Sequence, residues 1–510
     1  MPVLVHSCAL SGIDARIIEV EVELGGGLPH SALLGSAGSV VREGLARVEI
    51  VLGAPEFEIT RRRTTVNLAP AHLRKDGGAF DLAMALAILA AHGRVPEESL
   101  KDAAVIGELG LHGALRPVRG ALVCAMAARR AGMRRLIVPR PNAAEAALVE
   151  DIEVVAPANL QEAAGFLRGE CELEILTGGA SNDWPCDAPH GAEPDLADVR
   201  GQELARRALE VAAAGGHNLL FTGPPGAGKT MLAQRLPGIL PPLEWEEILE
   251  ATAVHSVAGL LGERALVAKR PIRAPHHTAS DAGLVGGGRP IRPGEIALAH
   301  HGVLFLDEFP EFSSGALEAL RQPLEDRKIV VSRVGQTCVF PTELVLVAAM
   351  NPCPCGYAGD PKRACRCAEA ARSRYRTKLS GPLLDRIDLQ VEVHAVPWVD
   401  LQKEKAGEPS ARVRERVLAA RARQQARRPQ AHPATNATIP AREIEDHCPL
   451  DAKSHARLEL AVERFGLSAR SFVRVLRVAR TIADLDDRER LNDADIAEAI
   501  QYRRADRDTP

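Results

Sequence analysis

One stretch of eight residues, GPPGAGKT from Gly223 to Thr230, constrains the fold of this chain more than any other feature. It matches the pattern G-x-x-x-x-G-K-[ST], in which glycines turn backbone N–H groups inward around an anion and the following helix adds its positive N-terminal end. Residues 217–221 before it are typical of a short buried strand, and residues 231–233 begin an apolar helix face. The stretch therefore predicts an α/β core with a phosphate-binding P-loop, also called a Walker A loop.

The residue types in this loop predict separate roles in binding ATP and Mg²⁺. We expect Lys229 to reach the β- and γ-phosphates and Thr230 to ligand Mg²⁺. A chance glycine-rich turn is the alternative interpretation. The predicted nucleotide-binding residues are Gly223, Pro224, Pro225, Gly226, Ala227, Gly228, Lys229, Thr230 and Met231.

Further polar positions follow in the order that an ATPase core requires. The apolar run 303–306 ends in Asp307 and Glu308, which we expect to hold Mg²⁺ and to deprotonate the attacking water, respectively. A second apolar strand, residues 344–349, leads to Asn351, whose amide can bond the γ-phosphate and the same water. A surface acid pair and a polar strand end are the alternative interpretations of these two positions.

Arg386, in the stretch GPLLDRIDL, is a candidate to act on a neighbouring subunit. A guanidinium presented to the neighbour's γ-phosphate acts as an arginine finger, because it stabilises the charge of the transition state. The alternative is an internal salt bridge to Asp385 or Asp388. The finger interpretation predicts a homo-oligomer.

Composition limits the other kinds of partner. The net charge of the chain is only −4, so any contact with nucleic acid depends on local basic stretches such as residues 61–63, 412–428 and 470–480. Each of these stretches is alternatively a solvated helix face. Aromatic residues make up 3% of the chain, which argues against stacking platforms for single-stranded bases.

No run of about 18 apolar residues exists, and the N-terminus, MPVLVHSCALSGIDA, lacks the basic and apolar regions of a signal peptide, so we expect a cytoplasmic protein without a membrane span. Cytosolic thiols stay reduced, so the ten cysteines are not expected to form a disulfide framework. Four of them form a C-x-C…C-x-C set, which is typical of a closed tetrahedral Zn²⁺ site. Reduced cysteines without metal are the alternative. The set is Cys353, Cys355, Cys365 and Cys367.

Length and periodicity predict about three domains. Residues 1–176 alternate strands, such as 15–22 and 65–68, with helices at 39–51 and 80–91, which predicts an α+β domain. Residues 177–194 are rich in Gly, Pro, Ala and Asp and predict a linker. Residues 195–395 hold the ATPase motifs, and residues 396–510 predict a helical domain with helices at 411–428, 452–465, 469–483 and 493–503.

Two stretches of the first domain, residues 74–89 and 107–132, resemble the proteolytic domain of the Lon protease family. That family uses a serine–lysine dyad within these stretches. The matching positions here hold Ala79 and Leu122, so neither a hydroxyl nucleophile nor an amine base is present. The resemblance implies the fold of the protease domain without its chemistry.

The whole chain resembles the YifB/ComM family of magnesium-chelatase-like AAA+ ATPases. The resemblance rests on RPIRAPHHTASDAGLVGGG (270–288), RPGEIALAHHGVLFLDEFPEF (292–312), LRQPLEDRKIVVSR (320–333), MNPCPCG (350–356) and SGPLLDRID (380–388). It implies an α/β protein with an N-terminal Lon-protease-like α+β domain, a central AAA+ P-loop α/β domain and a C-terminal helical lid. One departure is Ile387, where related proteins often have Phe.

The resemblance also implies roles for particular residues. Asn351 takes the position called sensor 1, and Arg470 begins a sensor 2 helix, from which it reaches the γ-phosphate. Arg474, Arg477 and Arg480 follow at helical spacing and predict a basic stripe on one face. Segment 270–288, with His276 and His277, is expected to face the pore of the ring or the substrate, and Lys328 and Arg333 of a hairpin are candidates for phosphate contacts, with a solvated hairpin tip as the alternative.

The function that the resemblance implies is a hexameric, ATP-driven motor on single-stranded or branched DNA, acting as a branch-migrating helicase in natural transformation. The residues alone predict only an ATPase with a trans-acting arginine. Two alternatives stay open. One is a protein-remodelling or metal-chelatase ATPase, and the other is an ATP-dependent scaffold whose Lon-like domain binds a partner.

Overall fold

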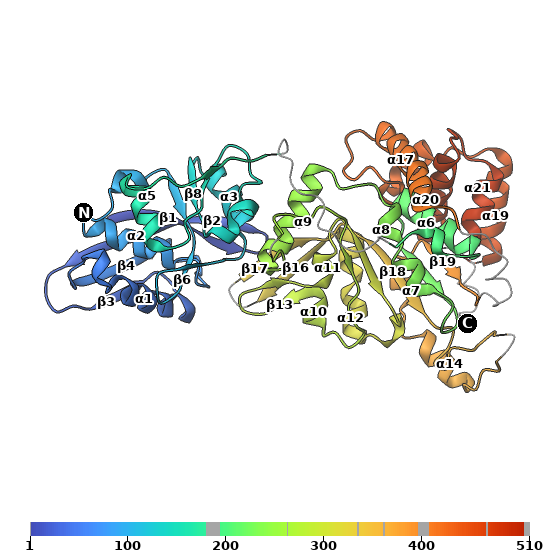
Figure 1. Cartoon of the computed structure of the whole chain (residues 1–510). Helices are drawn as coiled ribbons and strands as arrows, with labels where there is room; N and C mark the ends of the chain where they lie inside the picture. Colours follow the sequence, from blue (N-terminus) through green and yellow to red (C-terminus); the bar gives the residue numbers. More distant parts are fainter. Residues whose placement is uncertain are drawn as a thin grey trace.

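The computed structural model describes residues 2–179, 194–262, 264–333, 336–360, 363–395, 407–465 and 468–503. Most of the predicted linker, residues 180–193, lies outside this range. Figure 1 shows the N-terminal region, the nucleotide-binding region and the C-terminal helices following one another along an elongated molecule. None of the described helices is long and apolar enough to cross a membrane.

The N-terminal region is built on an eight-stranded mixed sheet in the order β10-β9-β8-β5-β1-β2-β4-β3. Buried and exposed residues alternate along β2, and α2 is buried on nearly every side, as its uniformly apolar sequence requires. The predicted helices and strands are confirmed with small shifts at their ends. The strands are β1 (Val3–Ser11), β2 (Asp14–Gly25), β3 (Ser31–Leu34), β4 (Arg63–Ala69), β5 (Ala103–Val105), β8 (Arg135–Ile137), β9 (Glu153–Val155) and β10 (Ile175–Leu176), with a separate hairpin of β6 (Glu108–Leu109) and β7 (Leu115–Arg116). The helices are α1 (Ser39–Leu52), α2 (Asp81–Ala91), α3 (Ala121–Arg130), α4 (Ala143–Ala146) and α5 (Leu160–Arg168).

The central region holds a five-stranded parallel sheet in the order β12-β15-β18-β11-β19. β15 and β18 are buried along their whole length, because helices cover both faces of such a sheet. All carboxyl ends of the strands meet at one edge, where the Walker A loop, Asp307 and Asn351 follow β11, β15 and β18, respectively. The strands are β11 (Leu219–Thr222), β12 (Ile272–Arg273), β15 (Val303–Leu306), β18 (Val345–Met350) and β19 (Leu389–Glu392).

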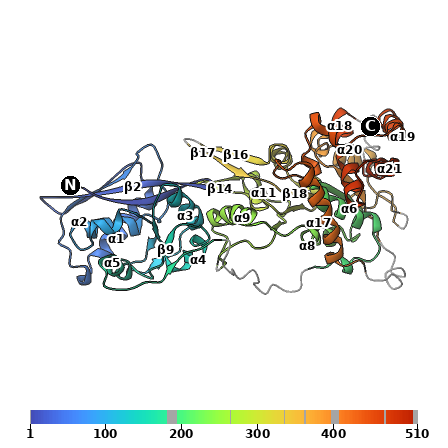
Figure 2. The same ribbon diagram turned by 90° about the horizontal axis from the view of Figure 1, so that it is seen from above.

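Helices and two hairpins surround this sheet. The hairpin before β18 forms where the sequence predicts it, and Figure 2 shows it extending from the core toward the N-terminal region. The hairpins are β13 (Gly286–Gly287) with β14 (Arg292–Pro293), and β16 (Lys328–Arg333) with β17 (Gln336–Pro341). The helices are α6 (Glu203–Gly215), α7 (Lys229–Ala233), α8 (Leu236–Ile239), α9 (Trp245–Ala258), α10 (Asp281–Val285), α11 (Glu295–Leu298), α12 (Ser314–Ala319), α13 (Arg321–Asp326), α14 (Glu369–Arg376) and α15 (Gly381–Leu384).

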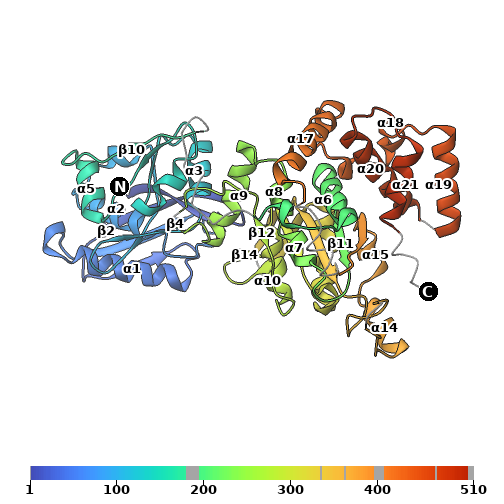
Figure 3. The same ribbon diagram turned by 45° about the vertical axis from the view of Figure 1, so that its right-hand side comes forward.

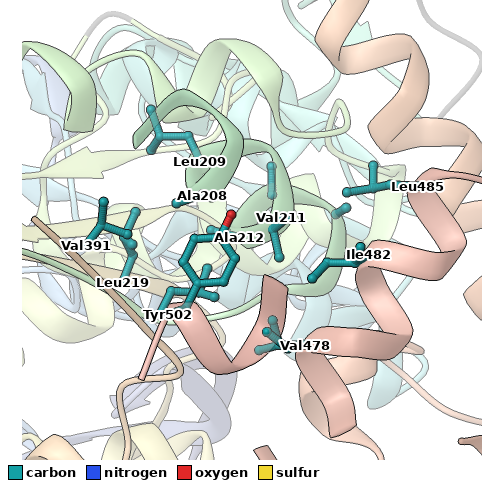
Figure 4. Packing of buried hydrophobic residues seen from close by; sticks show 14 of the residues in the cluster. Ala208, Leu209, Val211, Ala212, Leu219, Val391, Val478, Ile482, Leu485 and Tyr502 are labelled. Atoms are coloured by element: carbon teal, nitrogen blue, oxygen red, sulfur yellow. The ribbon is translucent and has the colours of Figure 1, made fainter. Parts of the chain in front are cut away.

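The C-terminal helices pack onto the sheet through α6. Figure 4 shows Val478, Ile482 and Leu485 of α20 meeting Val211 and Ala212 of α6 in one apolar cluster, which also includes residues of the sheet. The four predicted helices are confirmed, and a short one is added. They are α17 (Ser410–Arg427), α18 (Ile444–His447), α19 (Ala452–Phe465), α20 (Ala469–Leu485) and α21 (Asp493–Gln501).

The predicted basic stripe along α20 holds for Arg470, Arg474 and Arg477, which line one cavity, but Arg480 does not continue it. Arg480 is only 1% exposed, and it donates hydrogen bonds to Asp484 and to the carbonyl of Glu489. Arg477 donates to the carbonyl of Ile439. Arg480 therefore faces the interior of the helical region, whereas Arg477 also lines the cavity.

The N-terminal region contacts the central region through α3, which lies against α9 (Figure 2). Leu122 of α3 is fully buried in an apolar cluster that includes Ala253 and Val257 of α9. The hydroxyl of Ser256 donates to the buried carboxylate of Glu145. The position that matches the Lon lysine is therefore filled by a core side chain at this contact.

Candidate active site

The Walker A loop forms an open cradle between β11 and α7. Gly226 and Gly228 have φ values of 79° and 91°, a backbone conformation that favours glycine, and no atom lies within 4 Å of the position that a Cβ would take at either residue. Lys229 Nζ donates to the carbonyls of Gly223 at 2.6 Å and Pro224 at 3.0 Å. Burial lowers the pKa of this lysine from its ordinary value, against the nearby carboxylates of Asp307 and Glu308. The cradle and its lysine fit a bound polyphosphate.

Strand order brings the other predicted residues to this loop. Lys229 Nζ donates to Asn351 Oδ1 at 3.1 Å, and Thr230 Oγ1 donates to Asp307 Oδ2 at 2.8 Å. A hydroxyl and a carboxylate side by side are the oxygen donors that Mg²⁺ prefers, so this pair fits the metal that accompanies ATP. The backbone N–H of Glu308 donates to the other Asp307 oxygen at 2.8 Å, which fixes the orientation of that carboxylate.

Glu308 has a contact that the sequence did not predict. Its Oε2 atom lies 2.9 Å from Nδ1 of His277, in the segment that we expected to face the pore or the substrate. The side chain of Glu308 is half exposed, and its backbone has a φ of 52°, in the left-handed region. Because Glu308 and His277 lie far apart in the sequence, the only sequence feature that could have indicated this contact is the histidine itself. The contact connects that segment to the predicted catalytic carboxylate.

Arg386 and Arg470 lie on the opposite side of the sheet from the Walker A loop. Both line a cavity of about 640 Å³, whose other lining residues include Asn218, Gly302 and Asp388. These three residues immediately precede β11, β15 and β19, so the cavity lies at the amino-terminal edge of the parallel strands. Arg470 therefore does not face the nucleotide site of its own chain, which corrects the expectation that it reaches over that site from the lid.

Arg386 forms an ion pair, but not with either acid considered from the sequence. Its guanidinium pairs with Glu325 and donates to the carbonyl of Pro382 at 2.6 Å. Asp388 instead contacts Arg474 at 2.5 Å and Nδ1 of His217 at 3.3 Å. Although burial disfavours its charged form, these two partners hold the pKa of Asp388 well below its ordinary value. The buried carboxylate thus connects the start of β19 to α20.

The cavity carries an excess of positive charge. Arg421 donates only to the carbonyl of Ala213, at 2.8 Å, and Arg470 is exposed and makes no hydrogen bond or ion pair with the part of the chain that the structure describes. Seven arginines face five acids, and unneutralised guanidinium groups favour a phosphate ligand. The arginines are Arg270, Arg327, Arg386, Arg421, Arg470, Arg474 and Arg477, and the acids are Glu247, Glu325, Glu343, Asp385 and Asp388.

The four predicted zinc ligands converge. Cys353 Sγ lies 3.4 Å from Cys355 Sγ and 3.6 Å from Cys365 Sγ, and all four sulfur atoms, including that of Cys367, lie within 4.8 Å of one another. Tetrahedral zinc with Zn–S bonds of about 2.3 Å places its sulfur atoms about 3.8 Å apart. The backbone N–H of Ala358 donates to Cys353 Sγ at 3.3 Å, as in metal-thiolate loops. The donor set and its spacing fit Zn²⁺.

A second group of potential metal ligands, Glu250, His300 and His301, does not fit a bound metal ion. His300 Nε2 lies 3.1 Å from Glu250 Oε2, but the backbone N–H of Glu343 donates to His300 Nδ1 at 3.0 Å. Because Nδ1 accepts that hydrogen bond, Nε2 carries the proton and cannot ligate a metal. The group is a hydrogen-bonded network in which His300 donates to Glu250.

Fold and site together define an AAA+ ATPase of the magnesium-chelatase type. Residues 195–401 match the family described as "Magnesium chelatase, subunit ChlI", residues 20–142 match "Subunit ChlI of Mg-chelatase", and residues 407–503 match "Magnesium chelatase, subunit ChlI C-terminal". A Lon protease from Trichlorobacter lovleyi is 28% identical over 195 residues, which are 37% of this chain and 23% of that protein.

Two relatives that match nearly the whole chain show the family. The chain is 42% identical over 506 residues to the uncharacterized protein YifB of Salmonella typhimurium, covering 99% of this chain and 97% of YifB. It is 43% identical over 502 residues to the competence protein ComM of Haemophilus influenzae, covering 98% of this chain and 97% of ComM. The chain belongs to the YifB/ComM family.

Proposed function

We propose that this AAA+ ATPase works as a ring, by family likeness a hexamer, and couples ATP hydrolysis to movement along single-stranded or branched DNA. The observation that carries the proposal is the position of Arg386 and Arg470 in one arginine-rich cavity, on the side of the sheet away from their own Walker A loop. These arginines can serve a nucleotide only if a second subunit presents it. Such a contact joins two different surfaces, and repeated contacts of this kind form a ring when the rotation between subunits closes.

Within each nucleotide site, the residues of this chain have separate roles in ATP hydrolysis. Lys229 exchanges its carbonyl partners for phosphate oxygens, and Asn351, already 3.1 Å from the lysine, is placed to orient the attacking water. Glu308 accepts a proton from that water once it is free of His277. Thr230 and Asp307 would hold Mg²⁺, which would neutralise charge on the phosphates.

Exposed basic residues around the two hairpins support DNA as the substrate. Arg333, at the end of β16, lies beside Gly287, and Gly287 pairs with Arg292 of β14. Arg119 of the N-terminal region packs on Gly259 at the end of α9 and is close enough to Arg292 for mutual repulsion. Three exposed arginines from separate segments therefore gather around one hairpin, an arrangement that suits a phosphate backbone.

The exposed face of the β16–β17 hairpin adds further support. Lys328 points to solvent at the base of the hairpin, and Val330 and Val339, which are paired across the strands, are 40% and 48% exposed. A basic residue next to an exposed aliphatic pair can contact both the phosphates and the sugar edges of a strand. The name of the relative from Haemophilus influenzae, competence protein ComM, also favours a role with DNA.

Binding and strand displacement by the purified protein test this function. We expect the affinity for DNA to fall steeply with salt, with a log–log slope set by the number of phosphates neutralised. DNA should stimulate ATP hydrolysis, and ATP should drive strand exchange on a three- or four-stranded junction. Lys328→Ala combined with Arg333→Ala should weaken DNA binding and its stimulation of hydrolysis and leave basal hydrolysis intact, whereas Arg442→Ala, the loss of an exposed arginine in the helical region, should change neither.

One outcome would favour the alternative. A hexameric preparation that hydrolyses ATP but neither binds DNA at low salt nor moves a junction would contradict the DNA motor. It would favour an ATPase that remodels a partner protein or loads a metal, as the magnesium-chelatase likeness allows.

We also propose that Cys353, Cys355, Cys365 and Cys367 bind one zinc ion per chain, on the fit of the four sulfur atoms described above. Elemental analysis of protein purified without chelators should find about one equivalent of zinc. Absence of metal, with all four thiols freely reactive, would leave reduced cysteines as the correct interpretation.

A further inference from the structure

Asn351 and the segment that follows it are held at the active site by three contacts. The side chain of Asn351 accepts a hydrogen bond from Lys229. Its backbone N–H lies close enough to the hydroxyl of Tyr375, a buried residue of α14, to oppose the rise that burial causes in the pKa of that hydroxyl. Gly356, five residues further on, packs so closely on the Walker A proline Pro225 that a Cβ there would lie 2.5 Å from the proline ring. Sensor 1 and the Walker A loop are thus tied to the segment that follows β18.

The chain between these contacts forms a loop, and the cysteines lie where its outgoing and returning parts come together. It leaves Asn351, reaches Cys353 after one intervening residue, and passes through the remaining cysteines before α14 begins at Glu369. It then returns to Asn351 through Tyr375. Figure 3 shows α14 and the chain before it projecting from the body of the central region. The four sulfur atoms therefore join the outgoing and returning parts of one loop.

This loop has little apolar packing to keep it in place. Among its described residues from 353 to 367, Cys353 and Gly356 are the buried positions, and the others are exposed or half exposed. A segment with so few buried contacts opens easily on its own, whereas four metal–sulfur bonds cross-link it. Metal is thus the main available source of rigidity next to sensor 1.

We propose that zinc bound by the four cysteines fixes Asn351 and Pro225 in the geometry that hydrolysis requires, so that metal occupancy sets the rate of ATP hydrolysis. The inference rests on the proposed ATPase and zinc site. Under this inference the four cysteines position Asn351 and Pro225 and do not act on ATP themselves, because none of the sulfur atoms needs to touch ATP. Because Lys229 is held by the carbonyls of Gly223 and Pro224, which lie outside the cysteine loop, ATP binding should depend on the metal much less than hydrolysis does.

The test compares kcat with ATP affinity in the full-length protein. Cys365→Ser with Cys367→Ser removes two ligands far along the chain from Asn351. We expect zinc to be lost and kcat to fall by about 10–100-fold, because a displacement of about 1 Å at a reacting group costs a factor of this size. The affinity for a fluorescent ATP analogue should change by no more than about twofold, since the mutation removes no binding group.

Two variants serve as controls. Cys367→His keeps a zinc ligand and should retain both metal and most of the activity. Cys171→Ser removes a thiol of the N-terminal region, where Sγ contacts only the carbonyl of Glu162 among the described hydrogen bonds, and should retain both as well. Chelation of zinc from the wild-type protein, followed by addition of zinc, should lower and then restore kcat, which gives a result even if the double variant fails to fold.

The outcomes separate the inference from the functions on which it rests. Wild-type kcat in protein shown to be free of zinc would overturn the inference, as would an equal loss of ATP affinity and kcat. A wild-type protein that contains zinc but hydrolyses no ATP would contradict the proposed ATPase and the inference together. Zinc-free wild-type protein, as purified, that is fully active would contradict both the zinc site and the inference and leave the ATPase untouched.

Discussion

Mixing subunits with different defects tests whether both cavity arginines act across a subunit interface. Arg386→Ala alone should reduce hydrolysis by about 10³–10⁵-fold, the range found for arginine fingers. Lys229→Ala alone should abolish it, because the lysine is the cation of the Walker A loop. In rings assembled from equal amounts of the two variants, about one quarter of the interfaces combine an intact lysine with an intact arginine, so about one quarter of the wild-type rate should return.

The structure makes a sharper prediction for Arg470. Because it shares a cavity with Arg386, mixing Arg470→Ala with Lys229→Ala should also restore about one quarter of the wild-type rate. Mixing Arg470→Ala with Arg386→Ala should restore nothing, because every subunit then lacks one of the two arginines that it presents to its neighbour.

The measurement is phosphate release from mixed rings, with co-assembly verified by two affinity tags. If Arg470 acted on the nucleotide of its own chain, the two results would exchange. The mixture with Lys229→Ala would stay inactive, and the mixture of the two arginine variants would recover. That pattern would refute the assignment of both arginines to one intersubunit surface.

Three further predictions concern single chains. Glu308→Gln should bind ATP, as measured with a fluorescent analogue, yet lose hydrolysis by about 10²-fold or more, and a wild-type rate would show that the base is another residue. Asp388→Asn should lower the free energy of unfolding by about 3–5 kcal/mol at neutral pH, because it leaves Arg474 without its buried partner. Since the folded pKa of Asp388 is depressed, its stabilisation is complete above a pH of about 4 and is lost on acidification below that value, so denaturant titrations should show a weaker loss with acid in the variant. Casein should remain uncut, since Ala79 and Leu122 replace a Lon-type dyad, and cleavage that disappears on mutating this region would contradict the prediction.

The residues at the carboxyl edge of the sheet could be predicted from the sequence. Lys229, Asp307 and Asn351 each follow an apolar strand, and the strands of an α/β core are parallel, so their carboxyl ends meet. The structure has the expected neighbours, with Thr230 2.8 Å from Asp307 and Lys229 3.1 Å from Asn351. The convergence of the four cysteines follows in the same way from their spacing within one short loop.

Contacts between distant segments could not be predicted in this way. Glu325 as the partner of Arg386, and His277 as the partner of Glu308, depend on how separate segments pack, and no local pattern records that packing. The arginines after Arg470 have the spacing of an exposed stripe, but tertiary contacts bury Arg480.

The sequence by itself thus determined which residues meet at the proposed phosphate-binding edge of the sheet, because those residues are defined by their positions next to strand ends. Only the tertiary structure decided the direction in which the helical region presents Arg470. The packing of α20 against α6 sets that direction, through apolar contacts between residues more than two hundred positions apart. Since the side chain lies at the amino-terminal edge of the sheet, a residue expected to serve the nucleotide of its own chain lies on the other side of the sheet from that site.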